Sequence, residues 1–181
     1  MTPFSIVVAM DQKQGIGRNG ILPWHLKCDL QHFKEITTMA QDKSKRNAVI
    51  MGRKTWDSLP SQFRPLPKRV NVVVTRNENL QFPQDVLRVN GLEQALDLFV
   101  KGALSKTVES VYVIGGAQIF KQAIVRKECR KIYLTQILHS FDCDTFFPPF
   151  VDYFQHEVSS PRYVENDISY LFAEYSRKTT V

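Results

Sequence analysis

Cysteine is scarce in this sequence, and metal-binding motifs are absent from it. The 181 residues include three cysteines, Cys28, Cys129 and Cys143, which form no close pair. An odd number of widely separated cysteines argues against a disulfide framework and indicates a reducing compartment, so a cytoplasmic location is expected. The four histidines show no metal-ligand spacing. We therefore expect no metal ion.

Long apolar runs are also missing. No stretch approaches the roughly 18 consecutive apolar residues of a membrane-spanning helix. The N-terminus lacks a basic segment followed by an apolar signal core. We therefore expect neither export nor a membrane partner. Internal repeats, low-complexity tracts and linkers are absent as well. One domain over residues 1–181 is expected, long enough to bury a full hydrophobic core.

Acidic residues are almost absent from one part of the chain. Between Lys45 and Arg76 there are eight basic residues and one acid, Asp57, so this segment carries +7 while the whole chain carries +6. The basic residues stand at the ends of predicted strands and in turns, which argues against a merely solvated face. Such a segment suits a polyanionic ligand, either nucleic acid or a small molecule with phosphates and carboxylates. It lacks the interleaved aromatic platform of single-strand binding, so no obligate nucleic-acid partner is expected.

Strand and helix patterns alternate along most of the chain. Short runs rich in valine and isoleucine predict buried strands at residues 4–10, 47–51, 69–75, 86–89, 111–114 and 132–138. Helices are predicted at about 26–39, 55–59, 92–99 and 117–125, with Thr55 as the cap of the second. Residues 154–159 and 168–176 alternate polar and apolar side chains, which is typical of half-exposed antiparallel strands. The predicted fold is α/β, with a central, mainly parallel mixed sheet, antiparallel C-terminal strands and flanking helices.

A glycine-rich loop leads into the helix predicted at 26–39. Residues 15–20 contain three glycines, which leave the backbone free to adopt positive φ. Pro23 disfavours a helical Leu22, so we expect the helix to begin at about His25 or Leu26. At the helical period, four side chains near its start share one face about 100° wide: Leu26, Asp29, Leu30 and Phe33.

Asp29 would then lie on an apolar face beneath a mobile loop. Buried acids are rare unless they are paired or used in chemistry, so Asp29 is either a structural acid or a functional one, with equal weight on the two. Desolvation would raise its pKa, and the nearby helix N-terminus would lower it. The sequence leaves that balance open.

Two glycine-containing segments join a predicted strand to a predicted helix. Residues 52–55 read Gly-Arg-Lys-Thr, and residues 115–117 read Gly-Gly-Ala. Free backbone N–H groups at such turns favour anions, and ligands of open α/β sheets bind at the carboxyl ends of strands. Neither segment matches the dinucleotide fingerprint or a P-loop. Together with Arg76, which follows a third strand, they suggest a phosphorylated cofactor that supplies the main chemistry while the protein supplies one proton.

Five segments, taken together, resemble one enzyme family. They are GIGRNG with LPW at 15–24, VIMGRKTW at 49–56, RPL at 64–66 with Arg69, IGG at 114–116, and DTFFP at 144–148. In this order and spacing they resemble the dihydrofolate reductases over essentially the whole chain. The resemblance implies NADPH-dependent reduction of 7,8-dihydrofolate to 5,6,7,8-tetrahydrofolate by a monomer, with antifolates as inhibitors.

The resemblance also implies roles for particular residues. Asp29 matches the family's active-site carboxylate, which binds the pterin and promotes protonation of N5 while hydride passes to C6. Trp24 would hold a water near this acid, Thr135 would hydrogen-bond it, and Leu22 would close over the reacting atoms. Arg69 would clamp the α-carboxylate of the glutamate tail. The other implied substrate-binding residues are Val7, Val8, Leu30, Phe33, Lys34, Thr55, Ser58, Leu66, Ile114 and Phe120.

The implied cofactor site lies around the strand ends and the glycine loop. Arg76 near the 2′-phosphate implies NADPH over NADH, and Arg53, Lys54 and Thr75 match other phosphate positions. The remaining implied contacts are Ala9, Gly15, Ile16, Gly17, Arg18, Asn19, Gly20, Ile21, Leu22, Gly52, Thr55, Asn77, Gly115, Gly116, Ala117, Gln118, Ile119 and Phe120.

The sequence departs from common family patterns at several positions. Asp29 and its short spacing from the loop are typical of bacterial members, whereas the connections at 40–46 and 61–63 resemble longer eukaryotic ones. Phe120 stands where many members have tyrosine, and Phe63 where some have a polar residue. The alternatives are a pteridine or pyrimidine reductase on the same fold and a nucleic-acid-binding module. Asp29 together with Arg69 favours dihydrofolate, because Arg69 suits a substrate with a carboxylate tail.

Overall fold

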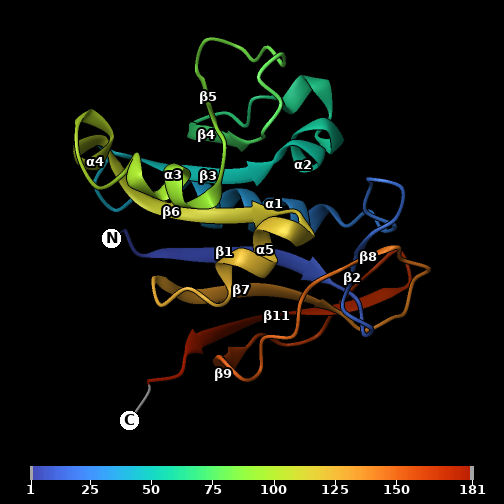
Figure 1. The fold of residues 1–181 in the computed structure, drawn as a ribbon. Helices are drawn as coiled ribbons and strands as arrows, with labels where there is room; N and C mark the ends of the chain where they lie inside the picture. The colour runs from blue at the N-terminus through green and yellow to red at the C-terminus, as the bar shows by residue number, and fades with distance from the viewer. Residues whose placement is uncertain (1, 180–181) are drawn as a thin grey trace.

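The core of the protein is one nine-stranded sheet, seen in a computed structural model that describes residues 2–179 (Figure 1). The strand order is β10-β11-β7-β1-β6-β3-β4-β5, with β9 also paired to β11. Neighbouring strands from β7 to β5 run parallel, whereas β11 runs antiparallel to β7, β9 and β10. The strands are β1 (Phe4–Met10), β3 (Arg46–Gly52), β4 (Arg69–Val74), β5 (Val86–Val89), β6 (Val108–Gly115), β7 (Cys129–Ile137), β9 (Phe154–Ser159), β10 (Tyr163–Glu165) and β11 (Ile168–Arg177). The mixed, mainly parallel sheet predicted from the sequence is confirmed.

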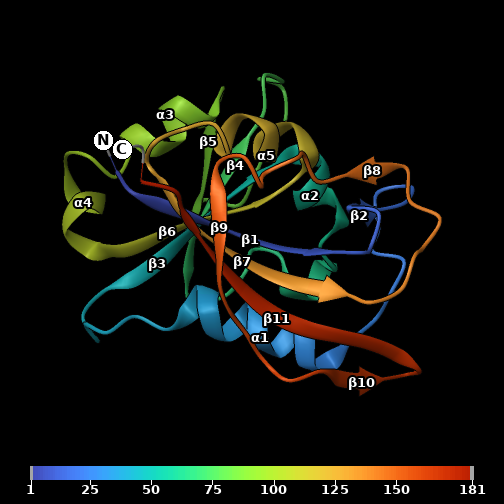
Figure 2. The same ribbon diagram turned by 90° about the horizontal axis from the view of Figure 1, so that it is seen from below.

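Helices cover both faces of this sheet. α1 lies on one face, and α3 and α5 lie on the other (Figure 2). Successive side chains of a strand point to opposite faces, so β1 contributes to both layers. Ile6 packs in the cluster that contains residues of α3 and α5, while Val7 packs in the cluster with α1 and α2. The helices are α1 (Lys27–Thr38), α2 (Arg53–Ser58), the 3-10 turn η1 (Ser61–Phe63), α3 (Leu92–Asp97), α4 (Ala103–Thr107) and α5 (Ala117–Ala123).

A third, smaller cluster joins the N-terminal loop to the C-terminal strands. Trp24 and Leu26, which precede α1, pack against Ile137 of β7 and Tyr170 of β11. All four side chains are buried. The start of α1 is therefore held against strands that lie more than 100 residues later in the chain.

Most predicted elements agree with the structure, but several details were wrong or missed. Thr55 is not a cap: it is the third residue of α2, whose N-terminal flanking residue is Gly52. The short elements β2 (Gly15–Gly17), β8 (Thr145–Phe146), β10 and α4 were not predicted. The strands among them are two or three residues long and owe their conformation to a distant partner, which leaves no periodic pattern to recognise.

Candidate active site

Asp29 lies in the first turn of α1 and is 7% exposed. Thr135 of β7 donates a hydrogen bond from Oγ1 to Asp29 Oδ1 at 2.6 Å. Burial raises the pKa of Asp29, the Thr135 hydrogen bond opposes that rise, and the negative charge of Glu165 adds to it. The balance that the sequence left open therefore favours a raised pKa. Asp29 is an acid that can hold a proton at a pH where an exposed aspartate has lost it.

Trp24, in the segment that precedes α1, carries an indole N–H donor that has no partner among the described residues. Its ring is buried and packs against Phe141, with ring centroids 5.3 Å apart. Its indole Nε1 is buried and has no hydrogen-bond partner among residues 2–179. Buried polar groups in native proteins are nearly always satisfied, so an unpaired N–H of this kind indicates a place for a water or a ligand atom.

Leu30 does not lie on a buried stripe as the helical pattern predicted. Its side chain is 46% exposed, whereas Asp29 is buried and Phe33 and Ile36 pack into the cluster beneath α1. Consecutive helical residues point about 100° apart, which places Leu30 at the margin of the buried face. Leu22, in the loop before α1, is similarly exposed.

Arg69 is a buried cation at the other end of α1. It begins β4 and is 7% exposed. Nη1 donates to Thr37 Oγ1 at 2.7 Å and Nε to the carbonyl of Pro67 at 3.0 Å, while the guanidinium lies 5.8 Å from the centre of the Phe33 ring. Desolvation lowers the pKa of Arg69 to about 10, which leaves it charged at neutral pH. Thr37 was not predicted, although it recurs on the Asp29 side of the helix.

The other residues implied for substrate binding fall into three groups. Val7, Phe33, Leu66 and Ile114 share the cluster on the α1 side of the sheet. The side chains of Val8 and Phe120 pack in the cluster on the opposite side, so they are not brought together with the first group. Lys34 and Ser58 are exposed, and Ser58 Oγ donates to the Thr55 carbonyl at 2.7 Å.

The two strand-to-helix turns lie next to each other. Met51 of β3 pairs with Gly115 of β6, which brings Gly52 beside Gly115 and Gly116. A Cβ on Gly115 or Gly116 would lie 3.1 or 3.2 Å from Thr55 Oγ1, and Gly115 has a φ of 128°. Gly115 therefore requires glycine, whereas a side chain at Gly116 would need Thr55 to shift slightly. Of the three residues that follow Gly116, Gln118 is exposed and Ile119 packs into the core, while Ala117 begins α5.

Cationic and polar side chains surround these turns. Arg53 Nη1 lies 2.5 Å from Asp57 Oδ2, and Lys54 and Arg76 are exposed. Thr75 is buried at the end of β4, and its Oγ1 accepts the Asn77 backbone N–H at 3.1 Å. Arg53, Lys54 and Arg76 therefore lie at the edge formed by the carboxyl ends of β3 and β4, whereas Arg46 and Arg69 begin these strands at the opposite edge.

The glycine loop is anchored by two aspartates. Asp11, 1% exposed, accepts the backbone N–H groups of Lys13 and Gly15 on Oδ1 and that of Phe141 on Oδ2, at 2.7 to 2.8 Å. Asp144 Oδ2 accepts the Asn19 N–H at 2.7 Å. The sequence pattern suggested a mobile loop, but it did not identify these anchors. The contacts from Asp144 to Asn19 and from Asp11 to Phe141 join residues 125 and 130 positions apart.

The tip of this loop is a tight turn. Arg18 and Ile21 exchange backbone hydrogen bonds around Asn19 and Gly20, which both have positive φ. Arg18 also forms an ion pair with Asp142. Ile21 is largely exposed, Ile16 packs at the edge of the core, and Ala9 packs against the Trp24 cluster.

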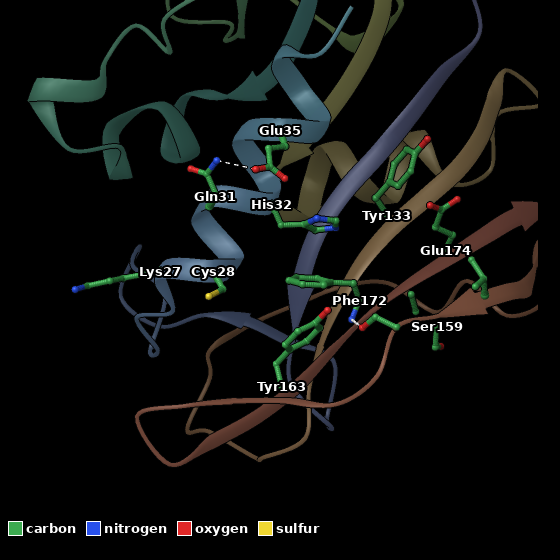
Figure 3. Close-up of a pocket in the computed structure, with 13 residues that line it drawn as sticks. Lys27, Cys28, Gln31, His32, Glu35, Tyr133, Ser159, Tyr163, Phe172 and Glu174 are labelled. Carbon is green, nitrogen blue, oxygen red and sulfur yellow. Dashed lines mark hydrogen bonds between the residues drawn. The ribbon is translucent and has the colours of Figure 1, made fainter.

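A cavity of about 850 Å³ opens between α1 and the strands β7, β9, β10 and β11 (Figure 3). Its lining includes Cys28 and His32, whose ring centroid lies 3.8 Å from that of Phe172. Asp29, Trp24 and Arg69 are not among its lining residues.

Residues 2–179 contain neither a cluster of metal ligands nor a helix that could span a membrane. No group of three or more histidine, cysteine, aspartate or glutamate side chains is arranged to hold a metal ion in this part of the chain. Within the same residues, no helix combines the length and the apolar composition that crossing a bilayer would need.

The fold and the site together define a class of protein. One mixed sheet carries paired glycine turns and cations at its strand ends, and one buried acid stands on the helix beside it. This arrangement suits an α/β enzyme that binds an anionic small molecule at its strand ends and uses one buried acid to move a proton.

Comparison with known proteins identifies the family within that class. A sequence model described as dihydrofolate reductase matches residues 3–177. A dihydrofolate reductase of Heliothis virescens is 40% identical over 185 residues, covering 96% of each chain. A structure titled Schistosoma mansoni dihydrofolate reductase superimposes with a TM-score of 0.85 at 36% identity, covering 98% of this chain and 99% of that one. The chain belongs to the dihydrofolate reductase family.

Some relatives are much longer. The bifunctional dihydrofolate reductase-thymidylate synthase of Glycine max is 44% identical over 178 residues, which is 96% of this chain but 33% of the relative. The chain therefore spans about a third of the length of these bifunctional relatives and nearly all of the shorter dihydrofolate reductases.

Proposed function

We propose that this protein reduces 7,8-dihydrofolate to 5,6,7,8-tetrahydrofolate with NADPH. The strongest support is a buried acid and a buried cation at the two ends of α1. Asp29 lies in its first turn, and Arg69 is bound to Thr37 in its last. Thr37 follows Asp29 by eight residues, which is about 12 Å along the helix axis. Dihydrofolate suits that spacing, because an aminobenzoyl group separates its pterin ring from its glutamate carboxylates.

In the proposed reaction, Asp29 provides the protonation that the pterin needs. It binds the pterin amino group and the adjacent ring nitrogen and promotes protonation of N5 through a water beside Trp24 Nε1. Bound NADPH would supply the hydride to C6. Thr135 keeps the Asp29 carboxyl oriented by donating to Oδ1. Because burial raises the pKa of Asp29, the acid is protonated over a wider pH range than an exposed aspartate.

The residues at the strand ends fit a cofactor with several phosphates. Arg53, Lys54 and Arg76 follow β3 and β4 and offer positive charge at one edge of the sheet. The absence of side chains at Gly115 and Gly116 leaves room for a ring to approach the backbone, where any Cβ would meet Thr55. We assign the phosphates to the cations, including the 2′-phosphate to Arg76, and the nicotinamide to the space between the glycine turns and the loop at 15–22.

The apolar part of the substrate would be enclosed by side chains on the α1 side of the sheet. Phe33 and Leu66 come from opposite sides of the proposed cleft and share one cluster with Val7 and Ile114. Leu30 and Leu22 are exposed in this structure and would lose water on binding, which contributes hydrophobic free energy to affinity.

A pteridine reductase on the same fold is the second candidate. It would use Asp29 in the same way but would have no need for a buried arginine at the far end of α1. Arg69 therefore favours a substrate with a carboxylate tail. The proposal also includes one functional domain over residues 1–181, a monomeric state and a cytoplasmic location, the last in keeping with three free cysteines.

The test is spectrophotometric oxidation of NADPH by the purified protein. Oxidation should require added 7,8-dihydrofolate and should stop when methotrexate is added. Turnover of a pterin that lacks the glutamate tail at equal kcat/KM would support the pteridine reductase instead. No oxidation with either substrate would reject both.

Arg76 gives a separate test of the cofactor. If Arg76 contacts the 2′-phosphate, Arg76→Ala should reduce the ratio of kcat/KM for NADPH to that for NADH by about tenfold or more, the size expected for one charged hydrogen bond. Arg130→Ala removes an exposed charge at the start of β7 and is the matched control. An unchanged ratio in Arg76→Ala would show that another residue recognises the phosphate.

A further inference from the structure

The helix that bears Asp29 has no N-terminal cap of its own. Leu26 flanks its first residue and offers no side-chain acceptor. At this end of the helix, the Leu30 N–H donates to the Leu26 carbonyl at 3.1 Å. The N–H groups of Lys27 and Cys28 therefore need acceptors from elsewhere, because the first turn of any α-helix leaves its donors unpaired.

Glu165 supplies those acceptors from the far end of the chain. Its Oε1 accepts the Lys27 N–H at 2.7 Å, and its Oε2 accepts the Cys28 N–H at 3.2 Å. Glu165 ends β10, and Figure 3 shows Lys27 and Cys28 at the end of α1 nearest the hairpin that carries Tyr163. One carboxylate thus takes the place of an N-terminal cap, because it accepts hydrogen bonds from both the Lys27 and the Cys28 amides.

The hairpin that presents Glu165 is well defined. Glu165 pairs with Ile168 across a two-residue turn, in which Asn166 and Asp167 both have positive φ. This is the turn geometry that matches the natural twist of a hairpin. Asn166 Nδ2 also donates to the His25 carbonyl at 3.1 Å, so the turn is attached to the segment before α1 as well as to its first two residues.

The charge of Glu165 acts on Asp29 as well as on the helix. The titratable groups that face Asp29 from neighbouring elements are Glu165 of β10 and Tyr170 of β11, with Cys28 beside it on α1. β7 contributes the neutral Thr135. The two backbone hydrogen bonds lower the pKa of Glu165, so it is ionised at neutral pH. A negative charge there offsets the positive end of the helix, which by itself would favour an ionised Asp29.

We propose that Glu165 is a positioning residue of the Asp29 site, because its carboxylate fixes the first turn of α1 and holds a negative charge at the helix end that bears the acid. This inference rests on the proposed function, in which Asp29 promotes protonation of the substrate. Glu165 touches neither substrate nor cofactor in this assignment. It acts through the helix and through its charge.

The test compares Glu165→Gln with a matched control, Glu109→Gln. Glutamine keeps one acceptor oxygen and removes the charge. Glu109 makes the same kind of contact elsewhere, because its carboxylate accepts the N–H groups of Gln41 and Asp42 at 2.7 and 2.8 Å. Both variants lose one charge and one bidentate contact, but only Glu165 lies at the end of α1 that bears Asp29.

The pH profile of kcat/KM should have a limb that falls as the pH rises. We expect Glu165→Gln to move this limb to lower pH by a few tenths of a unit, so that kcat/KM at a pH above the limb is about twofold lower than in the wild type. Glu109→Gln should leave the limb where it is in the wild type. Carbon-13 NMR titration of the Asp29 carboxyl, measured without substrate, should show the same downward movement in Glu165→Gln alone.

The NMR titration separates this inference from the proposed function. If the wild type does not oxidise NADPH with dihydrofolate but the Asp29 titration still moves in Glu165→Gln, the function is wrong and the coupling between Glu165 and Asp29 stands. If turnover is normal and neither the limb nor the titration moves, Glu165 is a structural cap only and the inference is overturned. An equal movement in Glu109→Gln would also overturn it, because the effect would then reflect net charge.

Discussion

At the scale of single residues, the site depends on two ionisable side chains kept out of water. Asp29 and Arg69 are each 7% exposed, and each is held by one threonine hydroxyl, Thr135 for the acid and Thr37 for the base. Burial raises the pKa of Asp29 and lowers that of Arg69, because water stabilises the charged form of both. The acid therefore tends to keep a proton, while the arginine, whose ordinary pKa is far higher, stays charged.

Asp29→Asn should affect activity and stability in opposite directions. Turnover near neutral pH should fall by about a hundredfold or more, the usual contribution of a positioned acid, while NADPH still binds. Stability at pH 7 should rise. Because the pKa of Asp29 is raised in the folded state, its contribution to stability is fully present below the ordinary aspartate pKa of 3.8 and is lost as the pH rises through the folded-state pKa. Asparagine cannot ionise, so the variant does not lose this stability at pH 7.

The check is kcat together with thermal unfolding at several pH values. The gain in melting temperature should be present at pH 7 and should vanish below the ordinary aspartate pKa of 3.8. Wild-type turnover in the variant would reject the proposed role of Asp29, and a variant less stable than the wild type at pH 7 would contradict the raised pKa.

Arg69→Leu should weaken substrate binding much more than cofactor binding. The loss of a charged partner for one carboxylate predicts a rise of about tenfold to a hundredfold in KM for dihydrofolate, with little change in KM for NADPH. Arg46→Leu is the control, because it removes an exposed charge from the same basic segment at the start of the neighbouring parallel strand β3. Steady-state kinetics with each substrate varied would decide, and equal effects on both KM values would place Arg69 outside the glutamate site.

At the scale of elements, α1 and the loop before it connect the parts of the site. α1 presents Asp29 in its first turn and Thr37 in its last, so the helix itself sets the distance between the two charged groups. The loop is fixed by acceptors on Asp11 and Asp144 and by close packing at Gly15, where a Cβ would lie 2.5 Å from Cys143 Sγ. Loop and helix are thus positioned by residues from both ends of the chain.

Gly15→Ala should therefore destabilise the protein and reduce turnover. The added methyl group has no room, since both Cys143 and Asp11 lie within 3.0 Å of its position. Forcing such a contact costs about 1–3 kcal/mol of unfolding free energy. Gly91→Ala is the control, because nothing lies within 4 Å of a Cβ at that position. Urea unfolding and kcat would be measured for both, and equal stability of the two variants would show that the packing at Gly15 is not limiting.

At the scale of the whole molecule, the charge distribution matches the proposed ligands. The segment from Lys45 to Arg76 has a large positive excess in a chain of net charge +6. Much of that segment lies between the start of β3 and the end of β4, and these two strands are paired side by side in parallel. The cations after their carboxyl ends therefore stand at one edge of the sheet, where a cofactor with several phosphates is proposed to bind.

Binding of NADPH should consequently weaken as salt is added. Raising the ionic strength from about 0.05 M to about 0.5 M shortens the screening length from more than 10 Å to a few ångströms. We expect KM for NADPH to rise several-fold while kcat changes little. The measurement is a salt series of initial rates, with potassium chloride and potassium acetate compared to exclude specific anion binding. A KM that does not depend on salt would mean that the exposed cations contribute little.

Local patterns in the sequence determined most of the fold. The valine-rich run at 4–10 is β1, and the helical pattern at 26–39 is α1 within one or two residues, because strong periodicity reflects burial on a defined face. The family segments likewise pointed to Asp29 and Arg69. Thr55 as a cap and Leu30 as a buried residue were wrong, since both depend on how a helix end and a helix margin meet the rest of the molecule.

The tertiary structure alone decided how that site is held. Thr37, Asp11 and Glu165 act on Arg69, the glycine loop and the first turn of α1, and none of the three lies in a recognisable motif. Glu165 is more than 130 residues from the amides that it binds. The hydrogen bonds from Arg69 to Thr37, from the amides of α1 to Glu165 and from Phe141 to Asp11 form only after the sheet has brought distant segments together. The sequence by itself therefore determined which residues face one another within an element, whereas the folded chain determined their partners, orientation and protonation.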